Sequence, residues 1–360
     1  MIVALDDTPD VVAVVPTLAG NLPRLRRCID SVCASEVSER LAIVIVWNDP
    51  RVECIDLGLV TIVEPGMNLG LPGGMNFARE FITAPRMWIV QDDMTVASNC
   101  LRLLMERQNQ ADNPAVVSPV ILNDQGLVPA KSRAGTVLPG GVLDQWYPLE
   151  DLSPEAFDSD VRLDWVSLSG ALVRCDAWDA VGGMDPAFYP LMHSDVDFGY
   201  RVTRKGMTVV LEPHVVISHE RNGSTPSLFA RFLYERNAER FEAKHGTPHS
   251  AESEDKSESI TEIASREASV MVVDFAQYAE RYIDGTRDMI SALEASAAEH
   301  YQHFLNAQNQ AQLSDVELER CRKALDEAIL LNQRLMASRS MRVTKPLRAL
   351  GALVRKMRQR

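Results

Sequence analysis

The sequence predicts an α/β protein with a mostly parallel sheet that carries helices on both faces, followed by an all-α extension. Three observations predict this fold class. Short β-branched runs alternate with helical patterns up to about residue 245, which is typical of βαβ units. The runs are continuously apolar, as in strands that are buried on both faces. Residues 260–338 contain no proline and only one glycine, Gly285, which indicates long helices.

The elements of the first part follow in order. A helix begins near Asn21 with Pro23 in its first turn, a short helix follows the Gly-rich stretch "NLGLPGGMN" (68–76), and a third helix is capped by Ser98. Strands are predicted in "VVAVV" (11–15), "LAIVIVW" (41–47), "VTIVE" (60–64), "MWIVQ" (87–91) and "AVVSPVIL" (115–122).

The middle of the chain is less regular. Residues 125–160 are loop-like because they are rich in Gly, Pro and acidic residues. A strand follows, then a helix capped by Asp176, and Ser194 forms a capping box with Asp197 for a helix that ends at Gly206. "AESEDKSES" reads as a charged linker. We therefore predict a domain at 1–248, a linker at 249–259, a helical or coiled-coil extension at 260–338 and a basic amphipathic tail at 339–360.

The composition excludes several classes of protein. The 360 residues carry a net charge of −13, whereas nucleic-acid binding needs a basic face, so no nucleic acid is expected as a partner. The first residues lack the pattern of a signal peptide, and no apolar run approaches the ~20 residues of a membrane-spanning helix. The six cysteines are scattered without metal or redox spacing, which predicts reduced thiols in a cytoplasmic protein.

The C-terminal part carries two weaker signals. Apolar residues recur every seven positions from Ile290 to Leu325, and His300 and Ser314 interrupt the partner row. This pattern is typical of a coiled coil, which would give a homo-oligomer, and equally of a hairpin packed on the first domain. The stretch that starts at Ser338 has eight Lys or Arg and no acidic residue. Its apolar positions share one helix face, which favours a basic helix on an anionic membrane surface over a solvated tail.

Two adjacent carboxylates, Asp92 and Asp93, end the apolar run of residues 87–91. Like charges at the end of a buried strand repel each other and lose hydration, so something must compensate them. A solvated turn is one solution, and a divalent cation with an anionic ligand is the other. The pair falls at the carboxyl end of a strand, which is where ligands bind in open parallel sheets.

Further polar residues follow the neighbouring strands. Thr17 comes just after the first strand, and Asn48 and Asp49 follow the second. The stretch "NLGLPGGMN" adds glycines that let the backbone approach a phosphate or sugar, and asparagines that offer amides. These residues are Gly70, Gly73, Gly74, Asn68 and Asn76. Taken alone, such a glycine loop is more often an ordinary turn.

The segment "LMHSDVDFGYRVTRKG" (191–206) places acidic residues at the start of a helix. Asp195 and Asp197 are explained structurally if they only complement the helix dipole. Asp195 is also held in the first turn, where a fixed element can position a general base. His219 closes an apolar run and could face the same edge of the sheet as Asp93, whereas His214 can be explained as a structural residue.

The order of these segments resembles family 2 of the inverting nucleotide-sugar glycosyltransferases, which have the GT-A fold. Within that family the chain is most similar to the branch of bacterial rhamnosyltransferases and galactofuranosyltransferases. The resemblance spans roughly residues 10–245. It rests on five motifs in the family's order, "NLGLPGGMNFARE", "QDDM", "SGALVRCDAWDAVGGMDPAFYP", "HSDVDFGYRVTRKG" and "VVISHE", and the C-terminal "SRSMRVTKPLR" is similar to the tails of many bacterial glycosyltransferases.

The resemblance implies a role for each matching residue. Asp195 is the base that activates the acceptor, His193 and Ser194 lie with the acceptor, and Asp197 binds the acceptor or orients the helix. Asp93 and His219 bind Mg²⁺ or Mn²⁺, of which the imidazole favours Mn²⁺. Gln91 replaces the first Asp of the metal motif and is the third ligand candidate, while Ser194 replaces the usual Glu. The donor site comprises Thr17, Asn48, Asp49, Asn68, Gly70, Gly73, Gly74, Asn76 and Asp92, with either Asn48 or Asp49 reading the base.

The implied function is metal-dependent, inverting transfer of a sugar from a nucleoside-diphosphate donor to a hydroxyl of a cell-surface glycan or lipid-linked acceptor. The first expectation is rhamnose from dTDP-rhamnose, and the second is galactofuranose from its UDP donor. The departures at Gln91 and Ser194 support a different class, a catalytically lost scaffold in a membrane-associated glycan assembly complex. A nucleotidyltransferase would need a Gly-rich, basic loop after the first strand, of which "PTLAGNLPRLRR" is a poor version. The basic tail implies a cytoplasmic protein that is peripheral on the inner face of the cell membrane.

Overall fold

The computed structural model divides the chain into two units, Met1–Ser269 and Val270–Arg360. It describes residues 2–50, 57–58, 60–122, 126–128, 134–138, 143–147, 150, 152–153, 156, 161–219, 227–246, 258–309 and 315–337. Within these ranges the side chains of residues 143–147, 218–219 and 227, and many in the second unit, lie outside the description.

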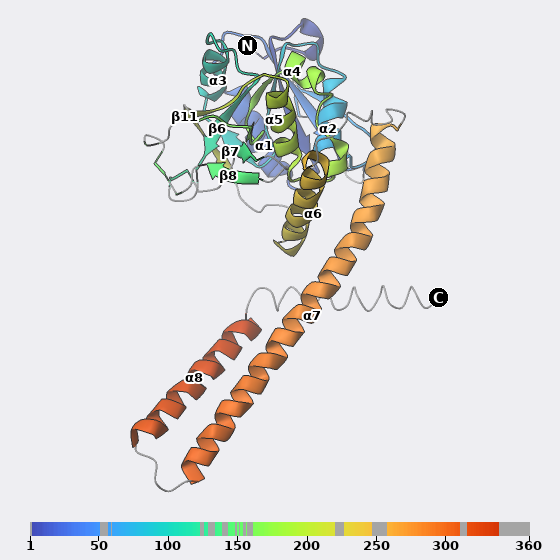
Figure 1. Cartoon of the computed structure of the whole chain (residues 1–360). Coiled ribbons are helices and arrows are strands. Elements are labelled where there is room, and N and C mark those ends of the chain that lie inside the picture. Colours follow the sequence, from blue (N-terminus) through green and yellow to red (C-terminus); the bar gives the residue numbers. More distant parts are fainter. Residues whose placement is uncertain are drawn as a thin grey trace, which may run out of the picture. The chain divides into compact units, whose positions relative to one another are not determined.

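The first unit is built on an eight-stranded sheet with the strand order β3-β2-β1-β4-β10-β6-β11-β5 (Figure 1). The pairs β1/β2, β1/β4, β2/β3 and β6/β11 are parallel, whereas β10 and β5 pair antiparallel with their neighbours. The predicted fold class, a mostly parallel sheet, is therefore confirmed. The strands are β1 (Val11–Thr17), β2 (Leu41–Trp47), β3 (Thr61–Val63), β4 (Arg86–Ile89), β5 (Met94–Val96), β6 (Val116–Ile121), β10 (Leu172–Arg174) and β11 (Val209–His219).

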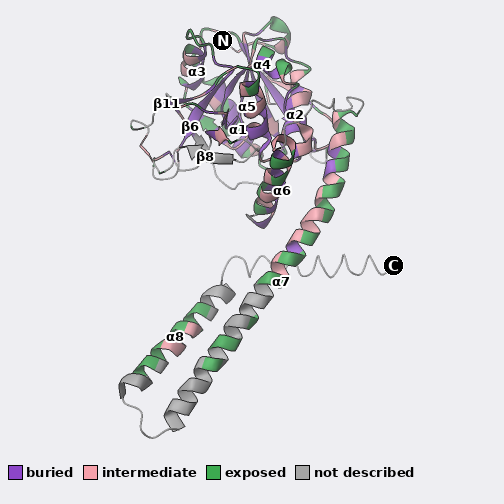
Figure 2. Cartoon of the chain, viewed as in Figure 1, coloured by how far each residue is buried: buried purple, intermediate pink, exposed green. Residues whose placement is uncertain are grey.

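Helices cover both faces of this sheet, as the apolar runs predicted (Figure 1). Along β1, Val12 and Val14 pack with the helices of one face, and Val11, Ala13 and Val15 with those of the other. The strands β1, β2 and β6 are therefore buried along almost their whole length (Figure 2). The first face carries α2 (Gly70–Arg79), α4 (Cys175–Ala180) and α5 (Ser194–Arg204), and the second carries α1 (Leu22–Cys33) and α3 (Cys100–Gln108).

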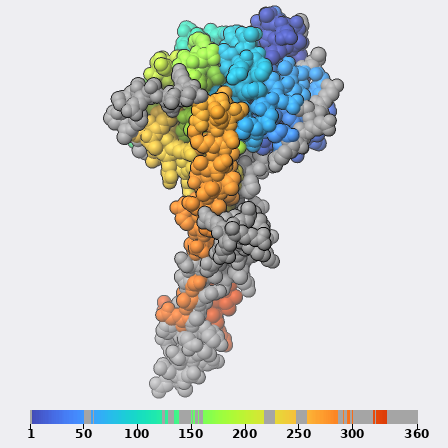
Figure 3. All heavy atoms as spheres, turned by 90° about the vertical axis from the view of Figure 1, so that its right-hand side faces the viewer, coloured from blue at the N-terminus to red at the C-terminus, as the bar shows by residue number. Residues whose placement is uncertain are grey.

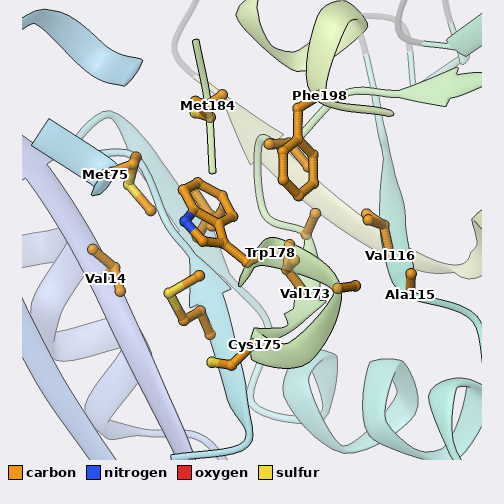
Figure 4. Close-up of a cluster of buried hydrophobic side chains, with 14 of the residues drawn as sticks. Val14, Met75, Ala115, Val116, Val173, Cys175, Trp178, Met184 and Phe198 are labelled. Atoms are coloured by element: carbon orange, nitrogen blue, oxygen red, sulfur yellow. The ribbon is translucent and has the colours of Figure 1, made fainter. Parts of the chain in front are cut away.

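The core on the first face is centred on a tryptophan. Trp178 of α4 lies between Met75 of α2 and Phe198 of α5, above Val14 of the sheet (Figure 4). Its ring centroid is 4.8 Å from that of Phe198. This packing joins α5, which begins at the candidate site, to the sheet that carries the rest of the site.

Helix starts differ from the prediction in three places. Asn21 caps α1 by accepting a hydrogen bond from the Arg24 amide at 3.0 Å, as predicted. Ser98 does not cap α3 because its hydroxyl bonds to Glu36, at 2.8 Å. The Ser194–Asp197 capping box is also absent, since α5 begins at Ser194 and Asp197 forms buried ion pairs instead. Asp176 lies in the first turn of α4 and pairs with the preceding arginine.

The segment predicted to be loop-like contains secondary structure. β7 (Ala134–Val137) and β8 (Leu143–Tyr147) pair with each other, and β7 also pairs with β9 (Trp165–Val166) to make a three-stranded antiparallel sheet. The Gly and acidic residues of this segment predicted a loop. The strands that form there are short and lack a clear apolar pattern, so they were not recognised as strands.

The first unit ends with helices that pack near α5. α6 (Ser227–His245) is followed by the first turns of α7 (Ile260–Asn309), where Ala264 and Glu267 are buried. Figure 3 shows the start of α7, in orange, between blue atoms of α2 and yellow atoms of α6. Ser259 and Glu262 form a capping box at the start of α7.

The second unit contains the remainder of α7 and α8 (Asp315–Ala337). The predicted long helices are present, while the choice between a coiled coil and a hairpin stays open. None of the helices in the described part of the chain is both long and apolar enough to cross a membrane. The predicted segment boundaries remain predictions, and the basic tail at 339–360 lies outside the described residues, as does most of the linker at 249–259.

Candidate active site

The residues proposed from sequence gather where several elements end. Thr17 is the last residue of β1, and Asn48 and Asp49 follow β2. Gln91, Asp92 and Asp93 connect β4 to β5, and Asp195 lies in the first turn of α5. Because β1, β2 and β4 are parallel neighbours, their carboxyl ends meet at one edge of the sheet.

A small pocket opens at this edge and brings two separate motifs together. Gln91, from the acidic segment, and Asp195, from α5, both line it. The rest of its wall comes from Leu71, Met75, Ile89, Leu168, Ser169 and Met184. The pocket is therefore mostly apolar, with an amide and a carboxylate among its few polar groups.

The first carboxylate of the acidic pair is compensated by protein groups. The Thr17 hydroxyl donates a hydrogen bond to Asp92 Oδ2 at 2.6 Å. The Arg24 guanidinium pairs with Asp92 Oδ1 at 3.2 Å, and both side chains are largely buried. Arg24 was not identified as a site residue from the sequence. It lies in the first turn of α1, the helix that follows β1, and is therefore close to the same edge of the sheet.

The pKa of Asp92 shows that this compensation is incomplete. Burial raises the pKa of its carboxyl group, and the charge of Asp93 adds to the rise. Thr17 and Arg24 act in the opposite direction but do not cancel it. The acidic pair therefore still carries an electrostatic cost that a bound cation would relieve.

The second carboxylate of the pair, Asp93, is the metal-ligand candidate that the resemblance implies. Its Oδ1 atom is buried at the turn between β4 and β5. His219, the last residue of β11, pairs in register with Met94, which directly follows Asp93. The backbone of His219 therefore lies next to the end of the acidic segment, while the His219 side chain lies outside the description, so its role as a ligand remains a prediction.

We tested whether these groups fit the cation that the resemblance implies. Within the described ranges no cluster of three or more His, Cys, Asp or Glu side chains could hold a metal. A cation at Asp93 and His219 would therefore complete its coordination with phosphate oxygens, which is a common arrangement for Mg²⁺. Asp93 offers a hard oxygen ligand of the right kind, so the residues fit a cation shared with a diphosphate.

The backbone of Gln91 is held in place by two hydrogen bonds. Its carbonyl accepts from Met94 N–H and from the Cys28 thiol, which fixes the turn between β4 and β5.

The Asn48 side chain binds the backbone of the Gly-rich stretch. Its Oδ1 accepts from Leu69 N–H and its Nδ2 donates to the Gly70 carbonyl, both at 2.9 Å. Asn48 is buried, so its main contacts connect the end of β2 to the start of α2.

The glycines of this stretch are helical rather than loop-forming. α2 begins at Gly70, inside the segment predicted to precede it. A Cβ at Gly70 would lie 2.8 Å from the Pro190 carbonyl oxygen, and one at Gly73 would lie 2.9 Å from Leu69 Cβ. A Cβ at Gly74 would lie 3.3 Å from Asn48 Nδ2. Close packing therefore accounts for all three glycines.

The two asparagines of the same segment also bond to backbone. Asn68 Oδ1 accepts from Gly70 N–H at 2.8 Å. Asn76 binds both polar groups of Met184, donating to its carbonyl at 2.6 Å and accepting from its N–H at 2.9 Å. Met184 lines the pocket, so Asn76 shapes the pocket wall through the backbone.

The two aspartates of α5 have different surroundings. Asp195 lines the pocket and accepts a hydrogen bond from Val196 N–H at 3.0 Å. Asp197 is completely buried and pairs with Arg201, Lys244 and His245. Of the two roles that the sequence left open for Asp197, these contacts favour orientation of the helix, here by attachment to α6.

Burial and ion pairing act in opposite directions on the pKa of Asp197. Burial alone would raise it, but the hydrogen bond from His245 and the charges of Arg201 and Lys244 outweigh that effect. The pKa of Asp197 is therefore held below its usual value. The carboxylate stays ionised and keeps its partners.

His193 and Ser194 are both buried at the start of α5. The His193 ring packs on Tyr234, with centroids 4.7 Å apart, and burial lowers its pKa to about 4. The imidazole is therefore neutral at physiological pH. Contact of either side chain with an acceptor, as predicted from the sequence, would require the covering residues to move.

Two of the solved structures that are similar to this chain, both at low identity, are GalNAc-T7 and PcManGT. GalNAc-T7 with UDP, GalNAc and Mn²⁺ aligns with 65% of this chain and 48% of its own chain, at 15% identity and a TM-score of 0.48. This chain thus spans about half the length of GalNAc-T7. The mannosyltransferase PcManGT from Pyrobaculum calidifontis, in complex with GDP-Man and Mn²⁺, aligns with 98% of this chain and 88% of its own, at 14% identity and a TM-score of 0.46. No protein-family model matches the sequence, and no curated protein matches it.

Replacing Arg24 by Met removes the cation beside the acidic pair. We expect the free energy of unfolding to fall by about 1.5–3 kcal/mol, because a largely buried carboxylate loses its charged partner. The double variant Arg24→Met/Asp92→Asn should recover part of this loss, because no charge is stranded. Urea denaturation of the wild type, both single variants and the double variant measures the coupling. Strictly additive losses contradict the pairing.

Replacing Asp197 by Asn leaves two cationic partners, Arg201 and Lys244, around a neutral side chain. We expect the variant to lose about 3–5 kcal/mol of unfolding free energy at neutral pH. The folded pKa lies below the ordinary value of 3.8, so the contribution of this group is complete above that value and is lost as the pH falls below it. The difference in unfolding free energy between the wild type and the variant should therefore become smaller in acid. Denaturation curves that keep the same gap at acid and neutral pH contradict this assignment.

Proposed function

We propose that this protein is a metal-dependent, inverting glycosyltransferase that moves a sugar from a nucleoside-diphosphate donor to an acceptor hydroxyl. The acceptor class we propose is a cell-surface glycan or a lipid-linked sugar. One observation carries the proposal: Gln91, beside the acidic pair, and Asp195, at the start of α5, line the same pocket. Displacement at an anomeric carbon requires a leaving-group site and a base that both reach the same pocket.

Asp195 supplies the base in this proposal. It lies in the first turn of α5, where the helix holds its carboxylate at the pocket wall. There it accepts the proton of the acceptor hydroxyl while that oxygen attacks the anomeric carbon from the face opposite the diphosphate, so the configuration inverts. When bound at Asp93 and His219, Mg²⁺ or Mn²⁺ neutralises charge on the departing diphosphate.

The remaining edge residues would hold the donor. Thr17 and Asp92 form one hydrogen-bonded unit at the end of β1, with acceptor oxygens suited to ribose or sugar hydroxyls. Either Asn48 or Asp49 would read the base, and the Asn48 side chain also binds the backbone at residues 69 and 70. Gly70, Gly73, Gly74, Asn68 and Asn76 serve the donor site indirectly, by fixing the start of α2 and the pocket wall.

The pocket wall favours a deoxy sugar. Five of its eight lining residues are apolar, namely Leu71, Met75, Ile89, Leu168 and Met184. Burying an exocyclic hydroxyl against such side chains without a partner costs roughly 1–3 kcal/mol, whereas the methyl group of rhamnose is favourably buried. We therefore keep dTDP-rhamnose as the first donor and the UDP donor of galactofuranose as the second.

A further part of the proposal concerns location. The basic amphipathic pattern of residues 339–360 supports peripheral attachment to the inner face of the cell membrane. Such attachment would bring the pocket to lipid-linked acceptors.

Asp195→Asn tests the proposed function directly. The amide keeps the size of the side chain but cannot take a proton. Release of nucleoside diphosphate from a donor panel, with Mn²⁺ and alkyl glycosides as acceptors, should fall by about 10²–10⁴-fold. Donor affinity by calorimetry should stay within about twofold, since the base lies on the acceptor side. Asp179→Asn is the matched control, because Asp179 is an exposed carboxylate that pairs with Arg79.

Two outcomes would overturn the proposal. Unchanged turnover in Asp195→Asn would remove the base from its role. No binding of dTDP, UDP or GDP, with Mn²⁺ present, would instead support the catalytically lost scaffold that the departures at Gln91 and Ser194 suggest.

A further inference from the structure

The loop that leads into the candidate base is held by an unusual number of side chains. Residues 187–192 directly precede α5, and all six of their backbone carbonyls accept a hydrogen bond. Five of the six bonds come from side chains of α6. The donors are Arg240 to Ala187, Asn237 to Phe188, Leu191 and Met192, Arg236 to Tyr189, and the Leu71 backbone N–H to Pro190.

The end of this loop has a backbone conformation that needs such support. Met192 has a φ of 73° and His193 a φ of 61°, in the left-handed region that residues with a Cβ rarely adopt. Such a conformation persists only where the surroundings hold it. Asp195 follows two residues later, so the same contacts set where its carboxylate enters the pocket.

One carboxylate organises the two arginines of this support. Glu267 Oε2 lies 2.9 Å from Arg236 Nη2 and 2.6 Å from Arg240 Nη1. Glu267 and Arg236 are both more than nine-tenths buried. Buried guanidinium groups need a counter-charge, and Glu267 supplies it while other N–H groups of the same arginines bind the loop. Without the Glu267 carboxylate, the two guanidinium groups would repel each other, and turning toward water would lower their free energy.

Glu267 does not come from the segment that resembles a glycosyltransferase. It lies in the third turn of α7, beyond the charged linker, although the first turns of α7 belong to the first unit. Ile260 is the first residue of α7, and its Cγ2 atom would lie 3.2 Å from a Cβ added at Gly73 in α2. The loop support is therefore completed by the start of the C-terminal extension.

We propose that Glu267 is a positioning residue for Asp195, acting through Arg236, Arg240 and the loop at 187–193. This inference rests on the proposed role of Asp195 as the base. It assigns the first turns of α7, which belong to the first unit, to the support of the active site, so that their packing against the arginines of α6 sets the rate of transfer. The part of the donor site formed by Thr17 and Asp92 is held by a separate set of contacts, with Arg24 of α1.

The test uses the full-length chain with Glu267→Gln, which keeps the shape of the side chain and removes its charge. We expect kcat to fall by about 10²-fold, since a displacement near 1 Å can cost that much, while the KM and the calorimetric Kd for the donor change less than about twofold. Glu267→Asp, which restores the charge, should recover part of kcat. Glu280→Gln, an exposed position on the same helix, should match the wild type.

Two further variants separate positioning from a general loss of stability. Leu104→Ala removes a buried side chain of α3 on the opposite face of the sheet and should lower the melting temperature without the kcat effect. If Glu267→Gln fails to fold, Arg240→Met is the milder variant, because Arg240 is partly exposed, and it should give the same split between kcat and KM.

The outcomes for the inference and for the proposed function are distinct. If Asp195→Asn abolishes transfer but Glu267→Gln and Arg240→Met change kcat no more than Leu104→Ala does, the inference is overturned and the proposed function stands. If Asp195→Asn leaves transfer unchanged, the proposed function fails first. Equal losses in kcat and donor affinity in the Glu267 variant would also contradict a positioning role.

Discussion

The ion pair between Arg24 and Asp92 is the contact on which the rest of the site depends. Two adjacent carboxylates at the end of a buried strand are unfavourable unless something compensates them. Arg24 reaches Asp92 from the first turn of α1, and Thr17 reaches it from the end of β1. These contacts join the β1–α1 corner to the β4–β5 turn. In our proposal Asp92 keeps these protein contacts, and Asp93 is the candidate for the cation.

Ionic contacts have the same importance on the opposite side of the pocket. Asp197 attaches α5 to α6, and Glu267 holds the arginines that bind the preceding loop. In the sequence, Asp195 lies between the loop that these arginines bind and Asp197. The pocket is thus bounded by elements whose positions are set by buried charges rather than by apolar packing alone. Buried ion pairs add little net stability but are costly to break, which makes them suitable for fixing geometry.

The sequence predicted the sheet more reliably than the site. Continuous apolar runs identified the main strands because burial on both faces leaves a clear local signal. Capping by Ser98 and Ser194 was predicted wrongly, since their tertiary surroundings outweighed a local preference. Arg24 and Glu267 carried no local signal, because each acts on a residue at least 27 positions away in sequence. Asp93 was proposed from the carboxylate pair at a strand end and Asp195 from the first turn of a helix, with the order of the motifs added to both, and their roles remain predictions.

Anomalous diffraction from crystals grown with Mn²⁺ and a nucleoside diphosphate tests the central claim most directly. Our account predicts a manganese peak about 2.1 Å from the Asp93 carboxylate, with His219 as a second protein ligand. Asp92 should remain bonded to Thr17 and Arg24. A manganese ion coordinated by Asp92 with Arg24 displaced, or bound nucleotide with no manganese at Asp93, would contradict it.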